Sequence, residues 1–241
     1  MMLYFQPIYN TDDDSLSGAE ALIRWNSRKY GFIGPNTFIP LLEDSALIIP
    51  LGRWIINTAA KACNRWITSI PDFVMHINLS FVQIVKSNIV KDVLENIERY
   101  SAANNHYVFE ITETIEMDQI PAVQNVFKEF VKNEFRFAID DFGTGYSNYG
   151  YMRDRTFDIV KVDRSFVTDI DKLKDNYLMV SFIIKMAHEM GLHVCIEGVE
   201  TKEELSCVKK LGADYIQGYY YGKPVCLQDF EEQHLKRFVL G

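Results

Sequence analysis

Short apolar runs alternate with longer amphipathic stretches along most of the chain. Runs rich in β-branched and aromatic residues predict buried strands, whereas apolar positions three and four residues apart predict helices. We expect strands at Leu3–Tyr9, Leu16–Trp25, Phe73–Leu79, Tyr107–Thr112, Arg136–Asp140, Phe157–Asp163, His193–Gly198 and Tyr215–Tyr219. We expect helices at Thr37–Ser45, Leu51–Thr68, Phe81–Tyr100, Ile120–Lys132, Lys172–Met190, Lys202–Leu211 and Leu227–Phe238.

Eight strands with helices between most of them predict an α/β fold, a barrel of parallel strands. The connection between the first two strands, marked by Asp12, Asp13 and Asp14, is too short for a helix. We therefore expect those two strands to pair antiparallel, a departure from the simple barrel. In the helix at Leu51–Thr68, the spacing predicts one common face for Trp54, Ile55, Thr58, Ala62 and Trp66.

The composition fits one domain over residues 1–241. The chain is 48% apolar and 24% charged and contains no Pro/Gly/Ser-rich linker. It starts almost inside a strand, which suggests a domain cut from a longer multidomain protein. No apolar run reaches membrane-spanning length and no signal peptide precedes the first strand. The four cysteines lack C-x-x-C spacing, so we expect reduced thiols and a cytoplasmic location for a domain whose parent protein could still be membrane-anchored.

The net charge of −8 argues against binding to DNA or RNA duplexes, which needs a basic face. A small anionic substrate remains compatible with this charge if metal ions neutralise the site locally.

One stretch, Phe135–Tyr146, ends an apolar run with two adjacent carboxylates, Asp140 and Asp141, followed by Gly143 and Gly145. Both acids can face one site only if the strand stops at Asp140 and the chain then turns, which the glycines allow. Two carboxylates this close repel each other unless a proton or a divalent cation lies between them. An Asx-type turn closing a strand explains the same residues without a metal, and this motif alone does not decide between the two.

Polar residues recur late in most of the predicted strands: Glu20, Arg24, Asn78, Glu110, Asp140, Lys161, Asp163, Glu197 and Gln217. The active site of a parallel barrel lies at the carboxyl ends of its strands. Each residue alone has an ordinary structural explanation, such as helix capping by Asn78. Several acids buried at one end of a barrel would be very costly without cations, so their coincidence favours a metal site. His76 and His193 are interpreted as ordinary strand residues, because oxygen ligands already suffice.

The chain resembles the EAL-domain family of cyclic di-GMP phosphodiesterases over nearly its whole length. The matching stretches, in order, are Gln6-Pro7-Ile8, Glu20-Ala21-Leu22 with Arg24 and Trp25, Asn78-Leu79-Ser80, Glu110-Ile111-Thr112-Glu113, Asp140 to Ser147, Lys161-Val162-Asp163, Glu197 to Thr201, Gln217-Gly218-Tyr219 and Lys223-Pro224. Departures such as Asn148 in place of a second serine remove no expected ligand. The resemblance implies a modified TIM (β/α)8-type barrel with one reversed strand.

The resemblance also implies hydrolysis of cyclic di-GMP to linear pGpG with two Mg²⁺ or Mn²⁺ ions. By similarity, one ion would be held by Glu20, Asn78, Glu110 and Asp140, and the second by Asp140, Asp141 and Glu197. Lys161 would orient the attacking water, Gln217 would position the water network, and Glu113 would anchor the Asp141–Ser147 loop. Arg24 and the Leu22 backbone resemble the substrate-binding pair, with Asp163 and Gln6 also lining the pocket.

Two other functions compete with this one: a receptor that binds cyclic di-GMP without turnover and signals through a partner, and a different metal-dependent barrel hydrolase. The retained ligands favour the active enzyme, because such receptors usually lose ligands. No Gly-Gly-Asp-Glu-Phe cyclase motif is present, so synthesis of the dinucleotide is not expected. The family also implies a homodimer and regulatory domains in the full-length protein.

Overall fold

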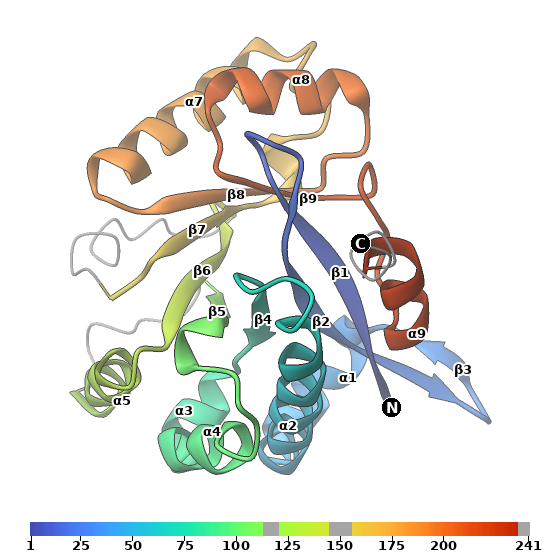
Figure 1. The fold of residues 1–241 in the computed structure, drawn as a ribbon, viewed down its shortest axis with the longest axis vertical. Coiled ribbons are helices and arrows are strands. Elements are labelled where there is room, and N and C mark those ends of the chain that lie inside the picture. The colour runs from blue at the N-terminus through green and yellow to red at the C-terminus, as the bar shows by residue number, and fades with distance from the viewer. Residues whose placement is uncertain (113–120, 145–155, 236–241) are drawn as a thin grey trace.

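Eight strands close a barrel in the computed structural model, which describes residues 1–112, 121–144 and 156–235. In spatial order the barrel strands are β1 (Met2–Asn10), β9 (Tyr215–Gln217), β8 (His193–Glu197), β7 (Ile159–Val162), β6 (Arg136–Phe142), β5 (Tyr107–Thr112), β4 (Val74–Asn78) and β2 (Leu16–Ser27). A direct pairing of β2 with β1 completes the ring (Figure 1). Two short strands, β3 (Gly31–Ile33) and β10 (Val225–Cys226), extend its edges.

The first strand runs against its neighbours, as the short connection predicted. β1 is antiparallel to both β2 and β9, whereas the strands from β2 through β4 to β9 pair parallel. Its register places Met2 opposite Arg24 and Gln6 opposite Glu20. The predicted modified barrel with one antiparallel strand is therefore confirmed.

Helices cover the outside of the barrel in two groups (Figure 1). The first group comprises α1 (Pro35–Asp44), α2 (Ile48–Trp66), α3 (Phe81–Lys86), α4 (Ile89–Ile97) and α5 (Pro121–Lys132). The second comprises α7 (Lys174–Glu189) and α8 (Lys202–Leu211), which contact each other. The short helix α9 (Leu227–Phe230) and a π-helical turn at Glu231–Leu235 pack against β1. Turns of 3-10 helix occupy Asn104–His106 and Arg164–Phe166.

Aromatic side chains fill much of the layer between strands and helices. Trp66 of α2 stacks on Phe230 of α9 at a centroid distance of 4.6 Å, and the edge of Phe5 in β1 meets Trp66 at 4.9 Å. On the opposite side, Phe130 of α5 packs against Phe109 of β5 at 5.1 Å. Burying each such side chain stabilises the fold by roughly 1.5–3 kcal/mol, so these contacts hold the helices in place against the strands.

Three predicted helices differ from the structure. In the predicted helix Leu227–Phe238, α9 ends at Phe230 and a π-helical turn follows to Leu235, while the last residues lie outside the described ones. The stretch Phe81–Tyr100 is not one helix, because α3 ends at Lys86, where Ser87 adopts an extended conformation. Asn88 then caps α4 by accepting a hydrogen bond from the Lys91 N–H. In α2, Trp54 is 40% exposed, contrary to the predicted common face. Apart from Trp66, the buried side of α2 carries small and aliphatic residues: Ile48, Gly52, Ile55, Ile56, Ala59, Ala60, Ala62 and Cys63.

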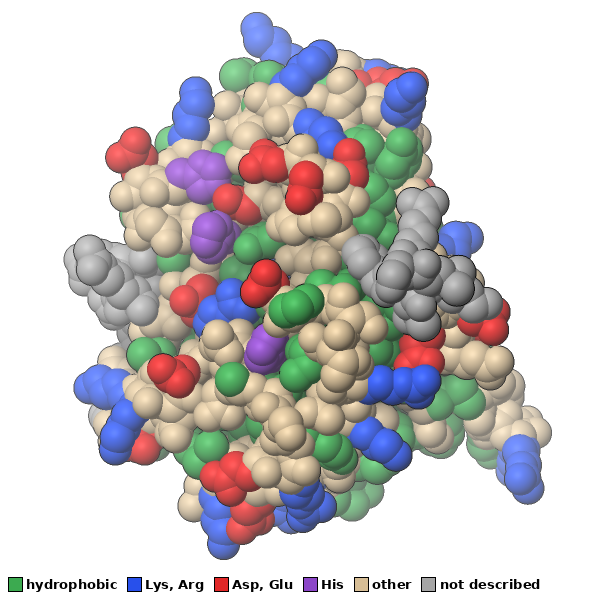
Figure 2. Space-filling view, in the orientation of Figure 1, with side chains coloured by type: hydrophobic (Ala, Val, Ile, Leu, Met, Phe, Trp, Pro, Cys, Tyr) green, Lys and Arg blue, Asp and Glu red, His purple; other side chains and the backbone are tan. Residues whose placement is uncertain are grey.

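Charged side chains of both signs are interspersed over the surface drawn in Figure 2. Among the described residues, no helix is long and apolar enough to cross a membrane. All four cysteines are free thiols. The densest gathering of charge lies inside the barrel rather than on its surface, and it defines the candidate site.

Candidate active site

Lys161 lies at the centre of the site, with its side chain completely buried. Its Nζ lies 2.7 Å from Glu197 Oε1 and 2.8 Å from Glu110 Oε1. It also lies 3.2 Å from Asp140 Oδ1 and 3.4 Å from Glu20 Oε2. The four acids come from β8, β5, β6 and β2, so separate strands bring their carboxylates to one place at the end of the barrel, as the sequence predicted.

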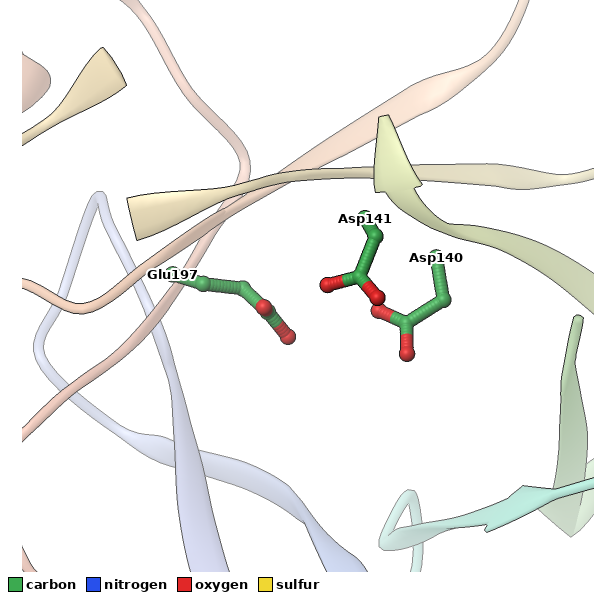
Figure 3. A group of neighbouring side chains, drawn as sticks. All are labelled: Asp140, Asp141 and Glu197. Atoms are coloured by element: carbon green, nitrogen blue, oxygen red, sulfur yellow. The ribbon is translucent and has the colours of Figure 1, made fainter. Parts of the chain in front are cut away.

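Asp140, Asp141 and Glu197 form a second cluster at the rim, and Figure 3 shows their carboxylates pointing toward one another. One oxygen from each lies within 4.8 Å of the others. The prediction that this strand stops at Asp140 is wrong, because β6 continues to Phe142. Its register against β7 shifts between Ile139 and Phe142, and Asp141 adopts φ +54°. This bulge, rather than a strand end, turns two successive side chains toward one site.

Amide side chains hold Glu20 from two directions. Asn78 Nδ2 donates to Glu20 Oε1 over 2.7 Å, and Gln217 Nε2 donates to Glu20 Oε2 over 2.6 Å. The same Gln217 nitrogen also donates to Gln6 Oε1 over 3.1 Å. Within the described chain, Gln217 Oε1 is buried without a hydrogen-bond partner. β1, β2, β4 and β9 therefore each contribute to one hydrogen-bonded chain beside Lys161.

The sequence interpretation missed His76. This residue of β4 is 4% exposed, and its Nδ1 lies 2.8 Å from Glu110 Oε1. Its position offered a signal, because residues two apart on a strand share a face and Asn78 was already a candidate. His193, by contrast, lies at the start of β8, where its Nδ1 is 3.1 Å from Asp214 Oδ1.

The packed charges shift several pKa values in opposite directions. Burial raises the pKa of Glu20, but Lys161 and the hydrogen bonds from Gln217 and Asn78 outweigh it and lower the pKa to about 2. Burial raises the pKa of Glu197 to about 8, against the opposing effect of Lys161. Burial would lower the pKa of Lys161, yet its acidic neighbours raise it well above the usual value.

Similar forces act on the remaining groups. Burial, then the charge of Asp140, raises the pKa of Asp141 to about 6. Burial and the charge of Glu20 raise the pKa of Glu110 well above its usual value, whereas burial and Lys161 lower the pKa of His76 to about 3. The single positive charge of Lys161 does not neutralise the surrounding carboxylates, and additional positive charge would let these carboxylates ionise together.

A cavity of about 490 Å³ opens beside the acids. Its lining includes Glu20, Leu22, Arg24, Asn78 and Asp140, together with Pro35 and Ile39 of α1. Arg24 is half-buried, and its Nη1 donates to the Ile23 carbonyl over 2.9 Å. The cavity therefore connects the acid cluster with two of the predicted substrate-binding positions.

The remaining predicted residues are Asp163, Gln6 and Glu113. Asp163 is half-buried and caps the turn at Arg164–Phe166, where its Oδ1 accepts from the Ser165 N–H over 2.9 Å. Neither Asp163 nor Gln6 is among the described residues that line the cavity. Glu113 lies outside the described residues, as does the Gly145–Ser147 part of the predicted loop.

Comparison with known proteins identifies the family. The model of the EAL domain matches residues 1–224, so the chain belongs to the EAL domain family. It is 34% identical to sll1895 of Synechocystis sp. over 245 residues, which cover 100% of this chain and 35% of that protein. It is 32% identical to PdeG of Escherichia coli K12, named a probable cyclic di-GMP phosphodiesterase, over 94% of this chain and 45% of PdeG. The chain thus spans less than half the length of these relatives.

Solved structures agree with the fold. The EAL enzyme Bd1971, in a form bound to cAMP and cyclic di-GMP, has a TM-score of 0.90 and 36% identity over 95% of this chain and 63% of that chain. The PaMucR phosphodiesterase in complex with c-di-GMP has a TM-score of 0.89 and 29% identity over 95% of this chain and 93% of that chain.

Proposed function

We propose that this chain hydrolyses one phosphodiester bond of cyclic di-GMP and releases linear pGpG. The observation that carries the proposal is the convergence of Glu20, Glu110, Asp140 and Glu197 around Lys161 in a chain of the EAL domain family. The names of PdeG and PaMucR support the substrate.

We further propose that two divalent cations, Mg²⁺ or Mn²⁺, bind at this site. Carboxylate and amide oxygens suit such ions, and Glu110 Oε2 is buried without a hydrogen-bond partner in the part of the chain that the structure describes. Glu20, Asn78, Glu110 and Asp140 would hold one ion, and Asp140, Asp141 and Glu197 the other. When bound, the cations lower the pKa of a water and brace the phosphoryl oxygens.

Charge balance supports a pair of dications rather than one. The five carboxylates of these two ligand sets carry five negative charges when ionised, and Lys161 contributes one positive charge. Two dications add four positive charges and make the site neutral. A single dication would leave two negative charges in a site where burial makes each uncompensated charge costly.

The chain's own residues supply orientation. Lys161 bears its charge within 2.8 Å of oxygens from two strands, a fixed position from which it would orient the attacking water and stabilise developing negative charge. Gln217 would position that water, since its amide is fixed at one end by Gln6 and Glu20. On the binding side, Arg24 and Leu22 line the cavity, and the Arg24 guanidinium and the Leu22 backbone would hold the anionic dinucleotide. Gln6 and Asp163, which do not line this cavity, would add further contacts. Glu113 would anchor the loop after Asp141.

The decisive experiment incubates the purified chain with cyclic di-GMP and either MgCl₂ or MnCl₂, and separates the products by chromatography. We expect pGpG to form with either metal and to disappear with EDTA. Glu20→Gln should abolish turnover, whereas Glu200→Gln should not, because Glu200 is exposed and pairs with Arg164 on the surface. Tight binding without product under every metal would instead indicate a receptor. Faster turnover of another phosphodiester would indicate a different hydrolase.

A further inference from the structure

His76 occupies an unusual place for a histidine. It lies on β4 two residues before Asn78, and its register places it opposite Glu20 of β2 and Val108 of β5. Its side chain is almost completely buried, so water cannot serve as its main hydrogen-bonding partner. A buried imidazole at this depth needs a protein partner, and its hydrogen-bond partner among the described residues is a proposed cation ligand.

The partner is the Oε1 atom of Glu110, 2.8 Å from His76 Nδ1. Lys161 Nζ lies 2.8 Å from the same oxygen. The other oxygen, Oε2, is buried and makes no hydrogen bond to any described residue. Glu110 is therefore fixed through one oxygen while the second remains available for a ligand.

Lys161 alone cannot set the orientation of Glu110. Its ammonium is shared among four carboxylates at 2.7–3.4 Å, so its three N–H donors are not directed at Glu110 alone. An imidazole N–H lies in the ring plane and points in one direction, and the ring is confined inside the barrel. A donor of fixed direction selects one rotation of the carboxylate, and that rotation decides where Oε2 points.

We propose that His76 is a positioning residue for the cation site: its Nδ1–H donates to Glu110 Oε1 and turns Oε2 toward the metal position shared with Glu20 and Asn78. An ionised Glu110 has no hydrogen to give, so the ring nitrogen is the donor. Partners of this kind commonly hold metal-binding side chains in place, and their loss weakens metal binding about 10–100-fold. The inference rests on the proposed function only for the presence of the cation.

Two substitutions separate positioning from packing. His76→Asn keeps an amide nitrogen the same number of bonds from the backbone as Nδ1, so it retains a donor to Glu110. His76→Gln places its nitrogen one bond farther out and loses that alignment. We expect His76→Gln to weaken Mn²⁺ binding about 10–100-fold in isothermal titration calorimetry of the full chain, and His76→Asn to remain within about threefold of the native protein.

A matched control and two further readouts complete the test. His193→Gln alters another strand histidine paired with a carboxylate, at the other end of the barrel, and should leave Mn²⁺ affinity unchanged. The Mn²⁺ concentration for half-maximal turnover of His76→Gln should rise, while the KM for cyclic di-GMP at saturating Mn²⁺ stays near that of the native protein. Thermal unfolding with EDTA reports any general loss of packing.

Specific results would overturn the proposal. Equal Mn²⁺ affinity of the native protein and His76→Gln would do so, as would equal weakening by His76→Asn and His76→Gln. A loss of Mn²⁺ affinity only in proportion to a lowered melting temperature would assign His76 a packing role. If the native chain binds Mn²⁺ but does not hydrolyse cyclic di-GMP, the proposed function fails while the calorimetric comparison still decides the role of His76.

Discussion

Removing the ammonium of Lys161 should destabilise the metal-free protein more than any surface change of the same size. In Lys161→Met the side chain keeps its length, but the four carboxylates within 2.7–3.4 Å of Nζ lose their shared cation. Breaking a buried ion pair by removing one partner costs about 3–5 kcal/mol. For a domain of this size that cost lowers the melting temperature by roughly 6–20 °C.

The assay is thermal or urea unfolding of both proteins, first with EDTA and then with saturating MnCl₂. A cation at about 100 times its Kd stabilises the folded state by about 2.7 kcal/mol. Because bound cations replace the charge that Lys161 supplied, the difference in stability between native and variant protein should narrow with Mn²⁺. Turnover of Lys161→Met should remain low even with the metal, since water orientation is lost.

A matched lysine provides the control. Lys172 is exposed, and its Nζ pairs with Asp169 Oδ1 at 2.6 Å on the surface. Lys172→Met should leave the free energy of unfolding nearly unchanged, because solvent screens this exposed ion pair. If Lys161→Met were as stable as Lys172→Met in EDTA, the idea that Lys161 balances the buried acids would be refuted. An unchanged difference with Mn²⁺ would argue against cations among those acids.

Three further outcomes are expected. Asp214→Asn should lower the free energy of unfolding by about 1–2 kcal/mol at pH 7. Burial would raise the pKa of Asp214, but hydrogen bonds from two histidines outweigh it and lower that pKa to about 2. The stability that the Asp214 carboxylate contributes is therefore complete above the unfolded pKa and is lost as pH falls through 2. Urea unfolding at pH 7 and pH 2 checks this, and an equal deficit at both values would contradict it. Gly198→Ala should lower the melting temperature and Mn²⁺ affinity, because Gly198 has φ +73° and a Cβ there would lie 2.3 Å from Arg164 Cβ beside Glu197. Gly212 has φ +82° and open space around an added Cβ, so Gly212→Ala should show only the backbone cost of about 1–2 kcal/mol and normal Mn²⁺ binding. Similar Mn²⁺ affinities of Gly198→Ala and Gly212→Ala would show that the clash at Gly198 does not reach the cation site. Asp140→Asn should weaken calorimetric Mn²⁺ binding at least about tenfold, since this residue is shared by both proposed ligand sets, and unaltered binding would remove it from them.

The alternation of strands and helices along the sequence was enough to predict that acidic side chains from separate strands meet at one end of the barrel. Glu20, Glu110 and Glu197 each follow an apolar run, and parallel strands bring their carboxyl ends to one rim. The same reasoning identified Lys161 as a site residue but did not predict that its ammonium lies among four carboxylates. A strand pattern shows on which face of the sheet a side chain lies, and it does not show which side chains lie across the barrel from it. His76 was interpreted as an ordinary strand residue because the oxygen ligands already sufficed, so its contact with Glu110 of the neighbouring strand was not anticipated.

Local backbone geometry accounts for two other differences. The bulge at Asp141 depends on pairing with β7, which lies beyond any local pattern, so the predicted strand end at Asp140 falls two residues before the observed end at Phe142. In α2, the large side chain of Trp54 suggested burial, whereas close packing selected smaller residues: a Cβ at Gly52 would lie 2.0 Å from Gln83 Nε2. Size and hydrophobicity alone do not reveal where two elements approach most closely.

The reversal of the first strand has a practical consequence for engineering. Because β1 runs against the other strands, its opening residues emerge beside the mouth of the cavity, where Met2 lies opposite Arg24. A fluorescent tag or ligand-sensing module joined ahead of Met1 would lie next to the cavity that we propose as the dinucleotide site. In a barrel whose strands all run the same way, that attachment point would lie at the opposite end of the barrel. Here a short leader would restrict access to the cavity, whereas a long leader would leave the cavity accessible.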